Sequence, residues 1–256
     1  MMSIQGKLKV SSVHFAISVV IAIFIAWLVF KVWFPYPYYK ISDGERIFLL
    51  ILCVDLICGP VLTFIVFNEN KKNKEIFFDM AVVAIIQFCA LAYGCYALVE
   101  ARPLYTVFEV DRFRVVTASE VQSEKNPMAS KGLENKFWDG PKVISLREPN
   151  DGQEYLKSLE MSLNGIPPSV RPDWWAQYID SKEKVLSVAH EVSFLYKYRP
   201  DEKNTIHELL KSNGYSSERV LWLPLTSEKN MGWIVFIDKS SAALIAYAEI
   251  DGFISE

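Results

Sequence analysis

The side chain with the clearest chemical potential in this sequence is an aspartate inside an apolar segment. Asp55 lies near the middle of residues 46–67, and Gly59-Pro60 follows it. As a helix this run is long enough to cross the hydrocarbon core of a bilayer, which takes about 20 apolar residues. An ionisable group there costs about 2.5–3.5 kcal/mol on insertion scales. Asp55 is therefore expected either to be buried as a neutral acid, bonded to a hydroxyl or to a carbonyl freed by Pro60, or to act directly in function.

A second carboxylate in an apolar segment, Asp79, raises one enzymatic interpretation. Intramembrane aspartyl proteases use two such groups, one that activates water and one that is protonated. Asp79 lies near the start of its segment, whereas Asp55 lies well inside its own. At 1.5 Å per helical residue, the two carboxylates would differ in depth by more than about 10 Å. The protease is therefore kept only as an alternative, and the glycine-flanked motif of that family is absent from the sequence.

Other patterns of catalytic or metal-binding residues are missing. His14, His190 and His207 have no Cys, His or paired acid at metal-ligand spacing. The sequence contains no G-x-S-x-G, H-E-x-x-H or phosphate-binding loop motif. We therefore expect no metal, no cofactor and no catalytic activity.

Three apolar segments are predicted to span a membrane as helices: residues 12–34, 46–67 and 76–99. Lys7 and Lys9 precede the first segment, as they would in a secretory signal. However, its apolar stretch is longer than the roughly 7–15 residues of a signal sequence, and no small-residue cleavage site follows it. We interpret it as an uncleaved anchor. Residues 100–256 have the composition of a soluble domain.

Lysine and arginine residues near the span ends predict the orientation. Lys7 and Lys9 precede the first span, and the loop NENKKNKE between the second and third spans carries three lysines. The loop between the first two spans has balanced charges. This pattern places the N-terminus in the cytoplasm. For a bacterial chain it predicts an inner-membrane domain, residues 1–99, followed by a periplasmic domain, residues 100–256, with the lipid bilayer as one partner.

Charge and cysteine usage also separate the two halves. Residues 1–99 hold 8 Lys and Arg against 6 Asp and Glu, whereas residues 100–256 hold 19 against 24. Nucleic acid is excluded as a partner, because its binding depends on neutralising phosphates with a basic surface. All four cysteines lie in the spans, and none of them forms a C-x-x-C pair. The second half must therefore be stabilised by its own apolar core rather than by disulfides.

The second half is predicted to be an α+β domain with an antiparallel sheet. The expected strands are residues 104–118, 143–146, 220–225, 232–238 and 242–250, and the expected helices are residues 151–163, 183–198 and 205–212. Tyr155, Leu156, Leu159 and Leu163 form an apolar stripe on the first helix. Thr205 and Glu208 have the spacing of a capping box. Residues 119–140 are expected to be a loose connection, and the proline-rich residues 166–172 a surface loop.

Several sequence blocks together carry a family resemblance. They are residues 54–63 (VDLICGPVLT), Phe78-Asp79 with residues 87–94, beginning at Gln87, and Arg102-Pro103 followed by residues 108–113 (FEVDRF), which contain Asp111 and Arg112. Looser matches are residues 171–175 (RPDWW) and 223–225 (LPL). With these blocks the chain resembles the type IV pilin accessory proteins of the TfpX/TfpZ group, from about residue 45 to the C-terminus.

The resemblance implies an inner-membrane protein, encoded beside a pilin, that has no catalytic activity and supports the assembly or dynamics of pili. Its expected partner is the cognate major pilin, and the pilus assembly machinery is a further candidate. The competing interpretation is a sensor or a subunit of another envelope complex. A sensor would normally need a cytoplasmic output module, and the predicted cytoplasmic face offers only about 11 N-terminal residues and one 8-residue loop.

Two surfaces are candidates for recognising the pilin. Asp79 lies at the depth where a processed pilin would present its N-terminal amine, although it could instead favour the first turn of its helix through the helix dipole. Trp174 and Trp175 could anchor the pilin head, or be core residues, or rest on lipid headgroups. Asp55, with a kink at Gly59-Pro60, is expected to organise the spans. Gln87, Arg102, Asp111 and Arg112 complete the candidate set through the resemblance.

Overall fold

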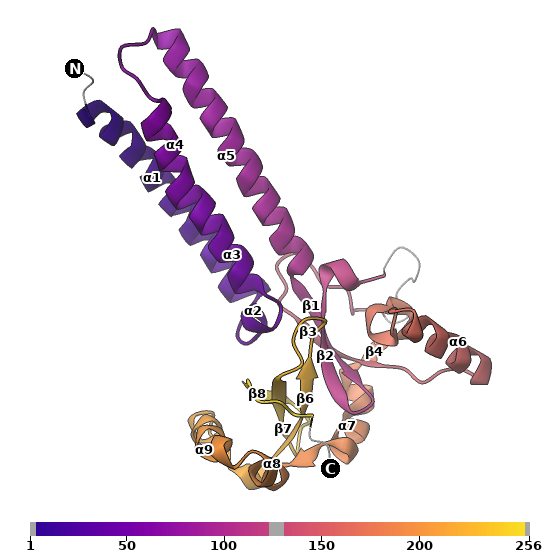
Figure 1. The fold of residues 1–256 in the computed structure, drawn as a ribbon. Helices are drawn as coiled ribbons and strands as arrows, with labels where there is room; N and C mark the ends of the chain where they lie inside the picture. Colours follow the sequence, from indigo (N-terminus) through magenta and orange to yellow (C-terminus); the bar gives the residue numbers. More distant parts are fainter. Residues whose placement is uncertain (1–3, 123–130, 254–256) are drawn as a thin grey trace. The chain divides into compact units, whose positions relative to one another are not determined.

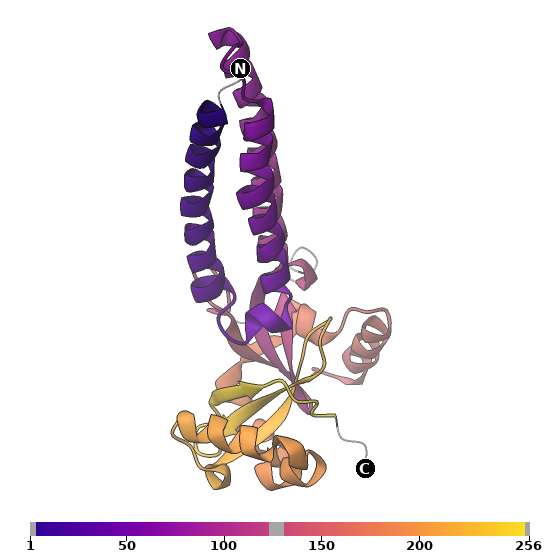
Figure 2. The same ribbon diagram turned by 60° about the vertical axis from the view of Figure 1, so that its left-hand side comes forward.

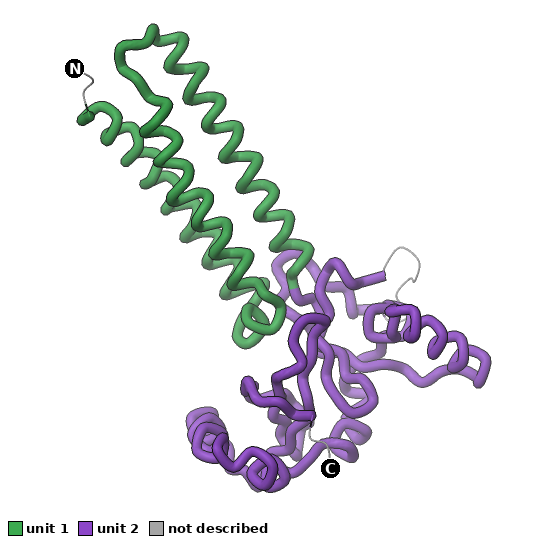
Figure 3. Tube along the Cα trace, in the orientation of Figure 1, with its two compact units in different colours: residues 1–102 green, residues 103–256 purple. Residues whose placement is uncertain are grey.

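The computed structural model describes residues 4–122 and 131–253. The chain divides into two compact units, Met1–Arg102 and Pro103–Glu256, which Figure 3 shows in different colours. Each unit has its own apolar clusters, so each is described by itself.

Three helices of the first unit are long and apolar enough to cross a membrane: Ile4–Trp33, Gly44–Val66 and Asn73–Ala101. They run side by side in Figures 1 and 2. The prediction of three long, apolar helices in this half of the chain is thus confirmed. The unit consists of α1 (Ile4–Trp27), the π-helical η1 (Leu28–Trp33), α2 (Tyr38–Ile41), α3 (Gly44–Leu52), the π-helical η2 (Cys53–Cys58), α4 (Gly59–Val66) and α5 (Asn73–Ala101).

The ends of these helices follow from local sequence. The first helix already includes Ile4, the first described residue, and so extends before the predicted residue 12, because residues 4–11 contain no proline and continue the same helix. In this first part of the helix, the ammonium of Lys7 contacts the Phe64 ring, with 5.6 Å between the ammonium and the ring centre. α5 ends at Ala101, where Pro103 restricts the preceding residue to extended backbone. Outward-facing apolar side chains cover all three helices, as expected of helices surrounded by lipid.

The second unit is built on one sheet with strand order β4-β3-β1-β2-β6-β7-β8, and β5 pairs with β6. The strands are β1 (Pro103–Glu109), β2 (Arg112–Thr117), β3 (Lys142–Leu146), β4 (Trp175–Gln177), β5 (His190–Glu191), β6 (Val220–Thr226), β7 (Trp233–Asp238) and β8 (Leu244–Ala248).

The sheet is mixed, so the prediction of an antiparallel sheet is wrong in part. β1 pairs parallel with β3, and β2 pairs parallel with β6. Parallel neighbours require a connection of a dozen or more residues, and the segments before β3 and β6 are long enough to return the chain to the same end. The predicted antiparallel pairing of the last three strands is confirmed.

Four α-helices accompany this sheet: α6 (Gly152–Leu163), α7 (Lys182–Val188), α8 (Val192–Tyr198) and α9 (Lys203–Ser212). Figures 1 and 2 show α8 and α9 beside β6, β7 and β8. The apolar side chains Val192, Leu195, Ile206 and Leu210 from these helices pack with Trp222 and other strand residues in one cluster. A second cluster contains Tyr105, Ile144 and Trp175 at the opposite part of the sheet.

Tertiary pairing overrides two of the predicted elements. The expected helix at residues 183–198 is broken, because His190 and Glu191 pair as β5 with Trp222 and Leu221 of β6. The predicted capping box at Thr205 is also wrong, since α9 already begins at Lys203 and Thr205 lies inside its first turn. A capping box occurs instead at Thr117 and Glu120, where β2 ends in a short 3-10 helix. Part of the predicted connection, residues 123–130, lies outside the described residues.

Candidate functional site

Asp55 lies where the second spanning helix changes its winding. The helix is α-helical over α3, π-helical over η2 and α-helical again over α4, and Asp55 is the buried residue of η2. Only 7% of the residue is exposed. Single π-turns inside α-helices often mark functional positions. The expected hydrogen bond from a hydroxyl or to a freed carbonyl is not formed: among the described residues, no donor bonds to the Asp55 carboxylate.

Polar contacts join the first and second spanning helices around Gly59-Pro60. The Ser11 hydroxyl donates to the Pro60 carbonyl over 2.8 Å. One turn further along, His14 Nδ1 and the Thr63 hydroxyl are 2.6 Å apart. In an apolar surrounding, an unsatisfied polar group is costly, so such bonds fix which helix faces meet. We call Ser11, His14, Gly59, Pro60, Thr63 and Gln87 the polar seam.

Gly59 is the point where the third helix joins the polar seam. A Cβ atom at this position would lie 2.9 Å from Gln87 Oε1 and 3.0 Å from His14 Nε2. Both distances are shorter than an ordinary contact, so a larger residue here would make Gln87 shift and would crowd the His14 ring, which is hydrogen-bonded to Thr63. Gln87 is 8% exposed, and its Oε1 accepts no hydrogen bond from any described residue. The structure therefore brings together three of the predicted residues: Gly59, Pro60 and Gln87.

Asp55 also borders a groove between the second and third spanning helices. The groove has a volume of about 130 Å³ and is lined by Leu50, Ile51, Val54, Asp55, Ala90, Leu91, Tyr93 and Gly94. A Cβ at position 94 would lie 2.5 Å from Ile51 Cγ1, so Gly94 allows the two helices to pack closely. Asp55 is thus the only ionisable carboxylate in a lining that is otherwise apolar apart from the Tyr93 hydroxyl. We call these eight residues the Asp55 groove.

Asp79 lies apart from Asp55 and forms an ion pair of its own. Its Oδ2 lies 2.5 Å from the ammonium of Lys71. Because α5 begins at Asn73, Asp79 is beyond the first turn and does not cap the helix. Asp55 is level with Ala90 on α5, eleven residues after Asp79, which corresponds to about 16 Å along a helix. This separation does not allow the two carboxylates to act as an aspartyl dyad.

The predicted residues around the start of the second unit are spread over different surroundings. Arg102 is 6% exposed, and its guanidinium lies 5.6 Å from the centre of the Trp33 ring. Asp111 and Arg112 form an ion pair with a 2.7 Å Nε–Oδ1 distance at the β1–β2 turn. The Arg112 guanidinium also lies 4.9 Å from the centre of the Phe253 ring. These residues do not converge on one site.

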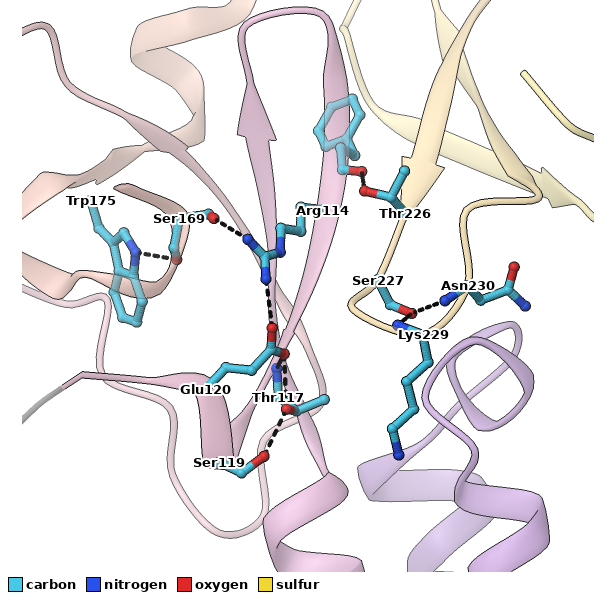
Figure 4. Close-up of polar contacts among 11 residues, drawn as sticks. Arg114, Thr117, Ser119, Glu120, Ser169, Trp175, Thr226, Ser227, Lys229 and Asn230 are labelled. Carbon is cyan, nitrogen blue, oxygen red and sulfur yellow. Dashed lines mark hydrogen bonds and ion pairs between the residues drawn. The ribbon is translucent and has the colours of Figure 1, made fainter. Parts of the chain in front are cut away.

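Trp175 is a core residue rather than a surface anchor. It is 1% exposed, and its ring centre lies 4.2 Å from that of Tyr105. Its indole N–H donates to the Ser169 carbonyl over 2.8 Å, and the Ser169 hydroxyl accepts from Arg114, as Figure 4 shows. The proline-rich segment predicted as a surface loop is consequently packed inward, with Ser169 fully buried.

Trp174 contacts two arginines and lines a second groove. It is 6% exposed, and the guanidinium carbons of Arg147 and Arg171 lie 4.7 and 5.0 Å from the centre of its ring. Arg147 pairs with Glu154 over 2.6 Å, and this bond is the main cause that lowers the pKa of Glu154 to about 2. Burial lowers the pKa of Arg171, whose guanidinium donates to Ser158 and Met161.

The apolar stripe predicted on α6 is present but faces outward. Tyr155, Leu156, Leu159 and Leu163 are 47–82% exposed, while Ser158 on the same helix is buried. Tyr155 and Leu159 line a groove of about 210 Å³ together with Phe108 and Val110 of the β1–β2 hairpin and with Trp174. We call this surface the α6 groove. An exposed apolar face of this kind is typical of an interaction surface.

The residues of the first helix that form the polar seam were not predicted from the sequence. His14 is considered above only as a possible metal ligand, and Ser11 and Thr63 are not named there as candidates. A signal was present: Ser11, His14 and Ser18 recur on one face of a helix, as do Asp55, Gly59 and Thr63. Small and polar residues that share one face of a spanning helix indicate a helix–helix contact.

Comparison with known proteins places the chain in a family. The model of the family "Fimbrial assembly protein FimB" matches residues 2–43. The chain is 33% identical over 247 residues to the fimbrial assembly protein of serogroup I from Dichelobacter nodosus, covering 96% of this chain and 95% of that protein. The serogroup E1 protein of the same organism is 32% identical over 246 residues, with the same coverage of both chains. No solved structure matches.

These full-length similarities confirm the resemblance to type IV pilus accessory proteins that the sequence blocks predicted. The matches extend along nearly the whole chain, so they include both units. The chain belongs to the family of fimbrial assembly proteins.

Proposed function

We propose that this protein is an inner-membrane accessory of type IV pilus assembly that acts on its cognate pilin. Its relatives are named as fimbrial assembly proteins, and none of those names refers to an enzyme. Three helices long and apolar enough to span a membrane support a membrane location. A pilin before assembly has the matching form, since it crosses the membrane with one apolar helix and carries a globular head outside.

The main structural support for this function is the Asp55 groove. Ala90 is small and only half-buried, so the backbone of an added helix can come close to α5 at this point. Asp55 adds one group that can accept a hydrogen bond or pair with a cation, and such an interaction is stronger in a surrounding of low dielectric than in water. An apolar pilin helix with a single polar group at the same depth fits these requirements. The polar seam then serves to hold the groove in shape.

The α6 groove supplies a second contact, with the pilin head. Its exposed Tyr155 and Leu159 take the anchoring role expected for the tryptophans, of which Trp175 is fully buried. Two contacts on one chain raise the effective affinity, because the second contact forms within an already associated pair. A protein with both grooves can hold a pilin by its helix and by its head.

Piliation of a deletion strain tests this function. The strain should make pilin but few surface pili, and the wild-type gene should restore them. Asp55→Leu should insert normally yet fail to restore piliation, whereas Asp55→Asn should restore it in part because it keeps a hydrogen-bonding group. Normal piliation in the deletion strain would refute the pilus role. Full piliation with Asp55→Leu at normal protein level would leave the pilus role standing and refute the use of Asp55.

A further inference from the structure

Two neighbouring aromatic residues in the second unit are exposed. Phe137 is 49% exposed and Trp138 is 62% exposed. Their rings meet edge to face, with centres 4.8 Å apart and an interplanar angle of 84°. The other tryptophans of this unit, Trp174, Trp175, Trp222 and Trp233, are at most 6% exposed. An exposed aromatic pair in a domain that buries its other tryptophans indicates a surface for interaction.

The exposed pair is held at the tip of an ordered turn. Phe137 and Trp138 are its two central residues, because the Asp139 N–H donates to the Lys136 carbonyl over 3.0 Å. In return, the Lys136 N–H donates to the Asp139 carboxylate over 3.0 Å, and the Lys142 ammonium lies 3.2 Å from the same oxygen. The bond from the Lys136 N–H is the main cause that lowers the pKa of Asp139, with the Lys142 side chain next.

The base of this turn is fastened to strand β1. The Asn135 amide donates to the carbonyls of Leu104 and Gly140 over 3.0 and 2.9 Å. The Tyr105 hydroxyl donates to the carbonyl of the buried Leu133 over 2.9 Å. The turn is thus carried by the sheet, and its two aromatic side chains lose little further conformational freedom when they bind.

The covalent chain limits how far this turn can be from the membrane. Leu104 follows Ala101, the last residue of the third spanning helix, by three residues. At no more than about 3.6 Å per residue, the two lie within about 11 Å of each other, whatever the orientation of the two units. Phe137 is two residues from Asn135, which bonds to Leu104. The tip is thus tethered to the end of the third helix by a short stretch of chain and one hydrogen bond, which leaves the headgroup layer within its reach.

We propose that Phe137 and Trp138 are a membrane-interface anchor that inserts into the lipid headgroup layer beside the third spanning helix. Tryptophan suits this layer because its ring is apolar and its indole N–H remains hydrogen-bonded. Lys136 at the start of the turn adds attraction for anionic headgroups. The anchor fixes the second unit at the bilayer surface. It rests on the membrane location alone and does not require the pilin.

A label on the turn tests this anchor in the full chain. Trp138→Cys and, as a control, Val110→Cys are made in a variant whose four native cysteines are alanine, and each is labelled with an environment-sensitive fluorophore. Val110 is 73% exposed at the tip of another turn, six residues further along β1 from Leu104, or about 20 Å. The proteins are reconstituted without pilin into vesicles of phosphatidylethanolamine and phosphatidylglycerol, with and without nitroxide-headgroup lipid.

The label at position 138 should emit at shorter wavelength than the label at 110, and only the label at 138 should be quenched by the nitroxide lipid. Equal emission and equal quenching at the two positions would overturn the proposal. So would a label at 138 that becomes shielded only when pilin is added, since the partner would then be a protein. Trp138→Phe in the native cysteine background provides a second test: brominated lipid should quench less tryptophan fluorescence in this variant than in the wild type, and the quenching that remains should come from the exposed Trp27 of the first helix.

Discussion

His14 in the first spanning helix hydrogen-bonds to Thr63 in the second, with Nδ1 and Oγ1 2.6 Å apart. The bond is formed between residues that are 49 positions apart in the sequence, next to the contact of Ser11 with the Pro60 carbonyl. Together these bonds set the register of the two helices. The register places Gly59 against Gln87 of the third helix, and the Asp55 groove lies one turn away.

A double-mutant cycle should measure the strength of the His14–Thr63 bond. Thr63→Val and His14→Phe each remove one partner while leaving an apolar group of similar size. Hydrogen bonds between spanning helices average about 0.6 and reach about 1.7 kcal/mol, so the coupling energy should lie in this range. Unfolding of the full chain in detergent gives the free energies. His14→Phe combined with Thr226→Val in the second unit serves as the control and should be additive. Additive losses for His14 and Thr63 would show that the bond does not form.

Gly59→Ala should destabilise the first unit without changing its polarity. The added Cβ would displace Gln87 Oε1, 2.9 Å away, and would crowd the His14 ring, 3.0 Å away and held by Thr63, so the cost should be near the lower end of the about 1–3 kcal/mol typical of overpacking. The matched control is Gly152→Ala, because a Cβ at the start of α6 meets nothing within 4 Å. Thermal unfolding in detergent should show a lower midpoint for the first variant and an unchanged or higher one for the second. Equal midpoints would contradict the close contact at Gly59.

Much of the first unit could be predicted from sequence, for a physical reason. Length and apolarity alone determine whether a segment can span a bilayer, so three long apolar helices could be predicted, the third (residues 76–99) to within about three residues of its ends at Asn73 and Ala101. Asp55 and Gly59 could be chosen as candidates because polar or small residues stand out in apolar segments, and Gln87 because of the family resemblance. Their partners were less visible. A lone His14 has no motif, and only the contact between helices shows that it faces Thr63.

Acid should destabilise the second unit partly through Asp238. This carboxylate accepts hydrogen bonds from the N–H and hydroxyl groups of Ser240 and Ser241, and these bonds, led by the Ser240 hydroxyl, lower its pKa to about 2. Its contribution to stability is full above the ordinary pKa of 3.8 and is lost as the pH falls towards about 2.

Denaturant unfolding of the full chain between about pH 5 and pH 2 measures this loss. Asp238→Asn should be less stable than wild type at pH 5, and its free energy of unfolding should fall less as the pH decreases. The exposed Glu160→Gln variant is the control and should follow the wild-type profile. If the free energy of unfolding depends on pH in the same way for wild type and Asp238→Asn, the hydrogen bonds from Ser240 and Ser241 do not keep the Asp238 carboxylate charged.

The second unit was predictable in its elements and less so in their arrangement. Alternating apolar residues identified the strands near residues 220–250, which pair as neighbours. The mixed sheet was missed, because the pairing of β1 with β3 and of β2 with β6 depends on long connections whose course the sequence does not specify. The apolar stripe of α6 was predicted correctly. Only the structure shows that this stripe faces outward and that the helix buries Ser158 instead. Likewise, only the structure shows that Trp175 faces the core.

Reporter fusions should establish the topology. The three lysines in the loop after the second span predict that this loop is cytoplasmic and that the C-terminus is periplasmic. Alkaline phosphatase fused after Glu256 should therefore be active, and the same enzyme fused after Lys74 should be inactive. The reverse pattern would place the second unit in the cytoplasm and would remove the proposed contact with the pilin head.

The most direct test of the central claim, that the Asp55 groove receives the pilin helix, is photocrosslinking in living cells from two positions of α5. Tyr93 lines the groove and is 73% exposed, whereas Phe88 is 71% exposed and lies about 140° away around the same helix. A photoreactive aromatic residue at position 93 should give a covalent adduct with pilin, the adduct should weaken in Asp55→Leu, and the residue at position 88 should give none. Equal adducts at both positions, or no adduct at position 93 in cells with normal pili and stable protein, would contradict the account.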